Sequence, residues 1–502
     1  MYFCRKIADF ENRISKTIDY ISKICGYKSN SQDITPQNLK QKTFIAKNRL
    51  QIIKTEKNMI QDIKIKNYLS FRDEVFLSFE ATKDRTREDN YVIEVAPGVR
   101  LLRFAMVMGA NGSGKSNLLQ AFDYLRHFWV EKPKDLEEST GVCPFLLDRE
   151  TNTQPSEFFI RFWIKGTKYS YHLCLDQKQV YREALNVYRS VQPTNVFTRE
   201  LVDGHTTVSF NPAVEKISEV AIEKLQLECL NNMSLFAARQ KVNLSLTVFD
   251  EVAEWMRTAF KPIIDPEIKM YEWAIDEMME DEDIKKHILK FLHTSDFNIC
   301  DIRSKVTTTE VPEKFVNFML NAPLSSETKE QLEKYHTINQ LNTNFVHHVV
   351  NHRGEEEYTM SDEYQSYGTR RIIGMETAIF EATKEGAILV IDELEASMHH
   401  DLVLYVLGKY LMQKSESQML VTTHCTPLLA WLDKLIRKDS VWFTDRERNG
   451  STNLYTLVEF KGLNRMNSIQ NAYLAGKFGA IPNITISNSN YQDNTEKTNA
   501  DE

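Results

Sequence analysis

The sequence predicts an α/β fold that is built around a phosphate-binding loop and extended by antiparallel strands. Three observations predict it. An apolar run, Leu101–Met108, leads into the glycine-rich segment Gly109–Ser116 and then into a helical pattern over Asn117–Trp129. A second apolar run, Ala387–Ile391, ends in two acidic residues. Alternating apolar and polar residues, typical of half-buried strands, flank the glycine-rich segment on both sides.

The composition excludes several classes of protein. Of the 502 residues, 42% are hydrophobic, 11% aromatic and 26% charged, which is typical of a folded, water-soluble protein. No apolar run approaches the roughly 18 residues that a membrane helix needs, and the start lacks the apolar core of a secretory signal. Seven scattered cysteines without a Cys-x-x-Cys pair fit reduced thiols. We therefore expect a cytoplasmic protein with no membrane partner.

The first 58 residues differ from the rest of the chain. They hold 12 Lys and Arg against 5 Asp and Glu, whereas the whole chain has a net charge of -8. Charge runs of this kind are usually solvated, so we expect a basic N-terminal extension over 1–58. The strand pattern begins at Met59, which marks the expected start of the folded domain and is a candidate for the natural start of the protein.

The segment Gly109-Ala-Asn-Gly-Ser-Gly-Lys-Ser116 matches the Walker A pattern in full. Backbone N–H groups of such a P-loop bind phosphate oxygens at the positive N-terminus of the following helix. Lys115 is expected to contact the β- and γ-phosphates of ATP, and Ser116 to ligate Mg²⁺. The expected nucleotide-binding residues here are Gly109, Asn111, Gly112, Gly114, Lys115, Ser116 and Asn117.

Asp392 and Glu393 directly follow the second apolar run, at the edge of the sheet where ligands bind in α/β proteins. Asp392 is expected to hold Mg²⁺ through water, and Glu393 to orient or deprotonate the attacking water. His424 ends another short apolar strand. A histidine there is more often structural, but its spacing from Asp392 fits a sensor of the γ-phosphate. The expected catalytic residues are Lys115, Glu393 and His424.

Ser366 and Gly368 open a predicted helix over Ile372–Ala382. Such residues offer a hydroxyl and N–H groups to an anion, although they also serve as ordinary helix caps. Gly368 lies 24 residues before Asp392. This spacing adds Ser366 and Gly368 to the expected nucleotide-binding residues.

The motifs follow one another as Walker A, a Ser-x-Gly signature, Walker B and a histidine at a strand end. This order resembles that of an ABC-type ATPase. The added antiparallel strands and Asn67-Tyr-Leu-Ser-Phe71 resemble the SMC/RecF-like branch. Ser366–Thr369, Asp392–Ser397 and Tyr473–Pro482 are similar to bacterial AAA-type ATPases of abortive-infection and restriction-linked loci. The predicted fold is therefore an α/β P-loop NTPase of ABC-ATPase type with added antiparallel strands and a helical insertion.

The resemblance implies an ATP-sandwich homodimer whose composite sites combine residues of both subunits: Lys115 and Ser116 from one, Ser366 and Gly368 from the other. It also implies that Glu393 is the catalytic carboxylate, that His424 is the switch histidine, and that Ser397 lies in a loop at the dimer interface. The signature Ser-Tyr-Gly-Thr-Arg departs from Leu-Ser-Gly-Gly-Gln, so turnover is expected to be slow or partner-dependent. Gln154 and Gln179 are both candidates for a Q-loop residue, and neither is assigned.

The motifs and patterns together divide the chain into five expected segments: a basic N-terminal extension (1–58), an N-terminal ATPase lobe (59–205), a helical insertion (206–345), a C-terminal ATPase lobe (346–482) and a disordered tail (483–502).

Three functions remain open at this point. The first is an ATPase whose ATP-driven dimerisation regulates a separate protein effector, as in bacterial phage defence. The second is a DNA-binding clamp of SMC/RecF type, which leaves nucleic acid open as a partner. The third is an ATPase-coupled nuclease, which is disfavoured because Asp445 has no evident carboxylate partners for a metal.

Overall fold

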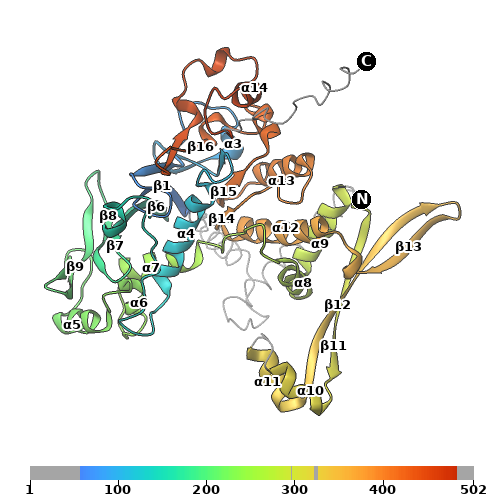
Figure 1. The fold of residues 1–502 in the computed structure, drawn as a ribbon, viewed down its shortest axis with the longest axis horizontal. Helices are drawn as coiled ribbons and strands as arrows, with labels where there is room; N and C mark the ends of the chain where they lie inside the picture. Colours follow the sequence, from blue (N-terminus) through green and yellow to red (C-terminus); the bar gives the residue numbers. More distant parts are fainter. Residues whose placement is uncertain (1–56, 296, 321–325, 483–502) are drawn as a thin grey trace, which may run out of the picture. The chain divides into compact units, whose positions relative to one another are not determined.

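The computed structural model describes residues 57–295, 297–320 and 326–482 (Figure 1). The described residues, from Lys57 onward, pack as one compact unit. The expected N-terminal extension, apart from its last two residues, and the expected disordered tail lie outside the described residues. No helix among the described residues is long and apolar enough to cross a membrane.

A five-stranded sheet carries the P-loop. Its order is β14 (Ile388–Ile391), β15 (Gln418–Thr423), β5 (Phe104–Gly109), β16 (Val441–Arg446) and β17 (Thr452–Thr456). The first four strands are parallel and β17 is antiparallel. Strands β14, β15 and β5 are buried along their whole length, which is why the sequence shows them as continuous apolar runs.

An antiparallel sheet of seven strands forms the expected addition to this core. Its order is β10 (His205–Phe210), β9 (Thr194–Val202), β8 (Val180–Tyr188), β7 (Thr167–Leu175), β6 (Ser156–Ile164), β1 (Met59–Lys66) and β2 (Val75–Ser78). Strands β6 and β7 form the predicted hairpin, and Lys165 and Gly166 turn the chain with positive φ, as a two-residue hairpin loop requires. The fold class of an α/β P-loop protein with added antiparallel strands is thus confirmed.

Two expected segments need correction. The apolar run Leu101–Met108 is not one strand. Its first two residues belong to β4 (Val99–Leu102), which forms a small hairpin with β3 (Val92–Ala96), and β5 begins at Phe104. Arg103 separates them, and its buried guanidinium donates to the carbonyl oxygens of Asn90 and Gln413. The N-terminal lobe also ends later than 205, because β10 extends to Phe210.

The insertion over 206–345 is not helical throughout, because its first part is mainly helical and its second part combines strands with helices. The first part contains α5 (Glu219–Glu228), α6 (Leu235–Arg239), α7 (Val248–Thr258), α8 (Tyr271–Glu280) and α9 (Glu282–Thr294). A separate three-stranded sheet then follows, formed by β11 (Ile299–Glu310), β12 (Thr337–Asn351) and β13 (Gly354–Ser361), with α10 (Glu313–Leu320) and α11 (Ser326–Tyr335) between β11 and β12 (Figure 1). The sequence did not predict these strands because β11 and β13 are mostly exposed on both faces and lack apolar alternation.

Two of the remaining α-helices begin at the motifs. The remaining α-helices are α3 (Glu88–Tyr91), α4 (Lys115–Val130), α12 (Tyr367–Glu385), α13 (His400–Met412) and α14 (Ile469–Leu474). Helix α4 begins at the P-loop and buries Leu118, Phe122 and Leu125 in the core. Helix α12 begins directly after Ser366. The helix expected after each of these motifs is therefore present.

Candidate functional site

The P-loop connects the end of β5 to the start of α4. Gly112 and Gly114 have φ of 72° and 100°, in the left-handed region that favours glycine. A Cβ on Gly109 would overlap Thr444, and one on Gly114 would lie 2.6 Å from Ser70 Oγ and overlap Thr452. The glycines therefore allow the loop to pack directly against neighbouring backbone and hydroxyl groups.

Lys115 lies buried within its own loop. Its Nζ donates to the carbonyl oxygens of Gly109 and Ala110, each at 3.1 Å. Burial lowers the pKa of Lys115, and the nearby carboxylates of Asp392 and Glu393 act in the opposite direction. Lys115 forms no ion pair with any residue that the structure describes, so its charge is available to an anion. This buried cation in a glycine loop fits the phosphates of a nucleotide.

Thr422 joins the two acidic residues of Walker B. Its buried hydroxyl donates to Asp392 Oδ1 and accepts the backbone N–H of Glu393 at 2.8 Å. Glu393 has φ of +48°, which is uncommon for a residue with a side chain and is often found at functional sites. The strand neighbouring Walker B therefore positions the carboxylate of Asp392 and the backbone of Glu393.

Loss of the Thr422 hydroxyl is expected to weaken the binding of Mg²⁺. Replacing Thr422 with Val keeps the shape of this buried side chain and removes the hydrogen bond that orients Asp392. Loss of such a supporting group typically costs about 10- to 100-fold in metal affinity. We expect the Mg²⁺ concentration for half-maximal ATP binding to rise about tenfold or more. Thr377→Val is the matched control, because Thr377 is equally buried but donates only within α12; an equal Mg²⁺ requirement in both variants would contradict the assignment.

Glu395 is a site residue that the sequence analysis missed. Its carboxylate accepts from Thr423 Oγ1 at 2.7 Å and from the backbone N–H of His424. It thereby ties the end of β15 to the loop that follows β14. The only signal in the sequence was its place two residues after Glu393, which has no meaning until β14 and β15 are known to be neighbours.

His424 is exposed at the end of β15. Partial desolvation lowers its pKa, and the positive charge of Lys115 lowers it further, although Glu395, Glu393 and Asp392 oppose this. These interactions place His424 in the electrostatic field of both Walker motifs. Its imidazole is expected to be neutral at neutral pH, so that it offers one donor and one acceptor.

Ser366 and Gly368 form the N-terminus of α12. Ser366 Oγ accepts the N–H of Thr369 at 3.0 Å, as an ordinary helix cap does. A Cβ on Gly368 would lie 2.8 Å from the carbonyl oxygen of Ser397. Among the described residues, neither Ser366 nor Gly368 forms a hydrogen bond or ion pair with the P-loop. The structure therefore places Gly368 beside Ser397.

The other expected nucleotide-binding residues differ in their surroundings. Asn117 donates to Ser70 Oγ at 2.8 Å, which connects α4 to the segment Asn67–Phe71. Asn111 and Gly112 are exposed on the loop, and Ser116 is half-buried in the first turn of α4. Neither Q-loop candidate is brought to the P-loop by a hydrogen bond in the part of the chain that the structure describes.

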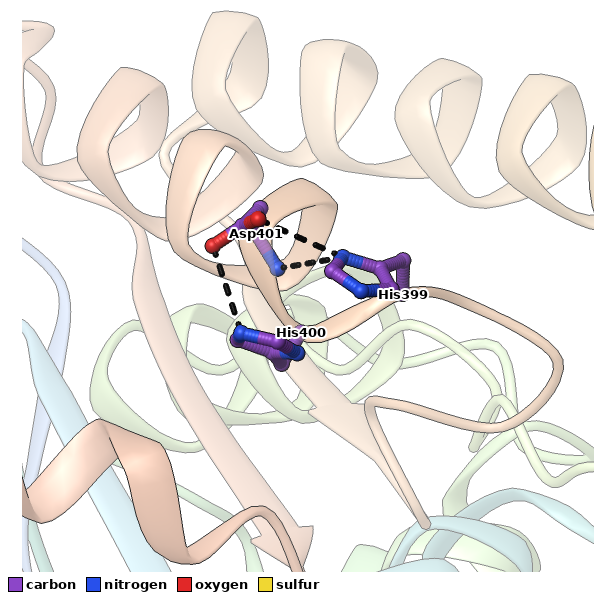
Figure 2. A group of neighbouring side chains, drawn as sticks. All are labelled: His399, His400 and Asp401. Atoms are coloured by element: carbon purple, nitrogen blue, oxygen red, sulfur yellow. Dashed lines mark hydrogen bonds and ion pairs between the residues drawn. The ribbon is translucent and has the colours of Figure 1, made fainter.

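His399, His400 and Asp401 form a separate exposed group at the start of α13 (Figure 2). Asp401 lies 3.4 Å from His399 Nδ1 and 3.4 Å from His400 Nε2. Their ligand atoms lie within 4.8 Å of one another. His399 also caps α13 by accepting the N–H of Asp401 at 3.3 Å. A helix cap accounts for this arrangement, and we assign it no metal.

A known protein family matches the parts of the chain that carry the P-loop and Walker B. Residues 104–215 and 297–430 match the family described as "AAA domain, putative AbiEii toxin, Type IV TA system". The chain carries an AAA-type domain of this family. The matched segments of the AAA-type domain contain the P-loop, the signature, Walker B and His424, so the resemblance to AAA-type ATPases of abortive-infection loci is confirmed. No curated protein matches the chain.

Solved structures show a remote likeness to SMC heads. The SMC head domain from Thermotoga maritima is 11% identical, with a TM-score of 0.35, and the match covers 79% of this chain and 98% of that one. An SmcHead bound to the C-winged helix domain of ScpA is 12% identical, with a TM-score of 0.37 and 80% and 99% coverage. An Smc head with an extended coiled coil, bound to the C-terminal domain of ScpA from Pyrococcus furiosus, is 11% identical, with a TM-score of 0.37 and 84% and 99% coverage. Likeness at this level defines neither the function nor the assembly of this chain.

Proposed function

We propose that the chain binds ATP with Mg²⁺ and hydrolyses it, and that ATP gates a homodimer which regulates a separate protein effector in anti-phage defence. The observation that carries the ATPase part is the arrangement of Lys115, Asp392 and Glu393. Strands β5 and β14 both flank β15 in parallel, so the ends that bear these residues share one edge of the sheet. A buried cation, with no ion-pair partner among the described residues, thus lies beside two carboxylates. A third strand holds Asp392 through its carboxylate and Glu393 through its backbone N–H.

Each residue has a defined part in this proposal. Lys115 and the N–H groups of the glycine loop would hold the phosphates, and Ser116 and Asp392 would hold Mg²⁺. The metal ion supplies neutralisation of phosphate charge. Glu393 would hold a water molecule and take its proton. His424, neutral and exposed, would donate a hydrogen bond to the terminal phosphate.

The dimer is proposed because, among the described residues, the signature forms no hydrogen bond or ion pair with the P-loop of its own subunit. Ser366 is exposed, caps a long helix and makes no described contact with the P-loop. The Ser366 hydroxyl and the first N–H groups of α12 can donate hydrogen bonds to an anion from another subunit. The defence role rests on the family match alone, and the DNA clamp and nuclease stay as predictions of the sequence.

A mixing experiment tests the composite site. Lys115→Ala and Ser366→Arg are each expected to be inactive alone, because each homodimer lacks one half of both sites. In a mixed dimer, one site combines an intact P-loop with an intact signature. An equal mixture is therefore expected to recover about a quarter of the wild-type ATPase rate. An inactive mixture in which mixed dimers are shown to form, for example with two affinity tags, would exclude sites shared between subunits.

A further inference from the structure

The β16–β17 hairpin contacts the P-loop from the side opposite Walker B. β5 lies between β15 and β16 in the sheet. Thr444 Oγ1 of β16 lies 2.6 Å from Ser113 Oγ. Thr452 Oγ1 of β17 donates to the carbonyl oxygen of Ser113 at 2.9 Å. The hairpin therefore supports the turn of the P-loop directly, although it lies outside the segments that match the family.

Arg446 ends β16 at this turn. Its Nη1 lies 3.5 Å from the carbonyl oxygen of Gly112, and a Cβ on Gly112 would lie 3.8 Å from the same nitrogen. The side chain is exposed. Within the described residues it forms no ion pair, so only a long hydrogen bond holds the guanidinium against the loop. No carboxylate of the described residues neutralises its charge.

The C-terminal segment Tyr473–Pro482 holds the strand that carries Arg446. Phe443 stacks on Tyr473, with ring centroids 5.5 Å apart, and on Phe478, at 5.8 Å. Tyr455 of β17 donates to the carbonyl oxygen of Phe478 at 2.7 Å. Gly479 has φ of +65°, and a Cβ there would lie 2.9 Å from Tyr455 Oη and 3.3 Å from Asp445 Oδ2. This packing fixes the end of β16 beside the loop.

We propose that Arg446 contacts the phosphates of ATP in the P-loop, from the side opposite Asp392 and Glu393. A guanidinium offers several donors in a fixed plane and pairs with phosphate more strongly than with a neutral carbonyl. Exchange of the long contact with Gly112 for a phosphate oxygen is therefore favourable. The second cation also offsets the carboxylates of Asp392, Glu393 and Glu395 on the other side of the loop. This inference rests on the proposed function, because it requires ATP in the P-loop.

The test is the affinity for a non-hydrolysable ATP analogue with Mg²⁺, measured by calorimetry. Arg446→Ala is expected to weaken binding at least tenfold, and Arg446→Lys to recover part of the loss. Arg448→Ala is the matched control, because Arg448 is exposed in the same loop and makes no described contact with the P-loop; it is expected to bind as the wild type does. The thermal midpoint of the nucleotide-free protein is expected to be the same in all four proteins.

The outcomes separate this inference from the proposed function. Failure of the wild type to bind the analogue overturns both. Tight binding by the wild type together with equal binding by Arg446→Ala overturns only the role of Arg446. A lower thermal midpoint of nucleotide-free Arg446→Ala, with no recovery of affinity in Arg446→Lys, shows a structural role and also overturns it.

Discussion

Replacement of Glu393 by Gln is expected to lower ATP hydrolysis by at least about 100-fold while ATP binding is retained. A positioned general base typically contributes about 10² to 10⁴ in rate, and an amide cannot take the proton from the attacking water. The exchange keeps the shape of the side chain. The backbone stays in place because Thr422 Oγ1 holds the N–H of residue 393. Phosphate release and equilibrium binding of ATP, measured on the same preparation, separate the two effects.

Glu333→Gln is a suitable control for this variant. Glu333 is an exposed carboxylate in α11, so the change removes one negative charge without touching either Walker motif. It is expected to hydrolyse ATP at the wild-type rate. Equal rates in the wild type and in Glu393→Gln would exclude the role assigned to Glu393. A loss of ATP binding in Glu393→Gln would show instead that this carboxylate positions the P-loop or the metal ion.

Replacement of Lys115 by Met is expected to abolish measurable ATP binding. Met fills the space of the aliphatic part of Lys115 but brings no charge to the phosphates, so the charge-assisted hydrogen bonds from Nζ to the phosphate oxygens are lost. The nucleotide-free protein is not expected to lose stability. Burial lowers the pKa of Lys115, which means that the folded state binds this proton less readily than the unfolded state does. The charged ammonium therefore opposes folding at every pH below its ordinary pKa, and Met removes this cost.

Differential scanning calorimetry and ATP binding check both parts of this prediction. Lys132→Ala, which removes an exposed lysine just after α4, is the control and is expected to bind ATP normally. A lower thermal midpoint in Lys115→Met would show that the hydrogen bonds from Nζ to Gly109 and Ala110 stabilise the loop more than burial of the charge destabilises it. Retained ATP binding would contradict the proposed site.

The parts of the fold that local sequence decides were predicted from the sequence. The apolar strand, the glycine turn and the helix of the P-loop follow one another within 30 residues, so their pattern is visible without tertiary information. The β6–β7 hairpin is equally local, because alternation and a two-residue turn define it. In contrast, β11 and β12 pair across the intervening α10 and α11, and β11 and β13 expose both faces over much of their length. These segments are strands because they pair with one another, and the apolar pattern of a sequence does not show which segments pair.

The sequence by itself determined that this chain has a P-loop, a Walker B pair and the residue types that ATP and Mg²⁺ require. Only the tertiary structure decided which groups surround them. Thr422, Thr444 and Arg446 contact residues that lie 30 to 334 positions away in the chain. The physical reason is that a motif encodes the local backbone, whereas the order of strands in the sheet decides which strand ends meet. That order places Walker B on one side of the P-loop and Arg446 on the other.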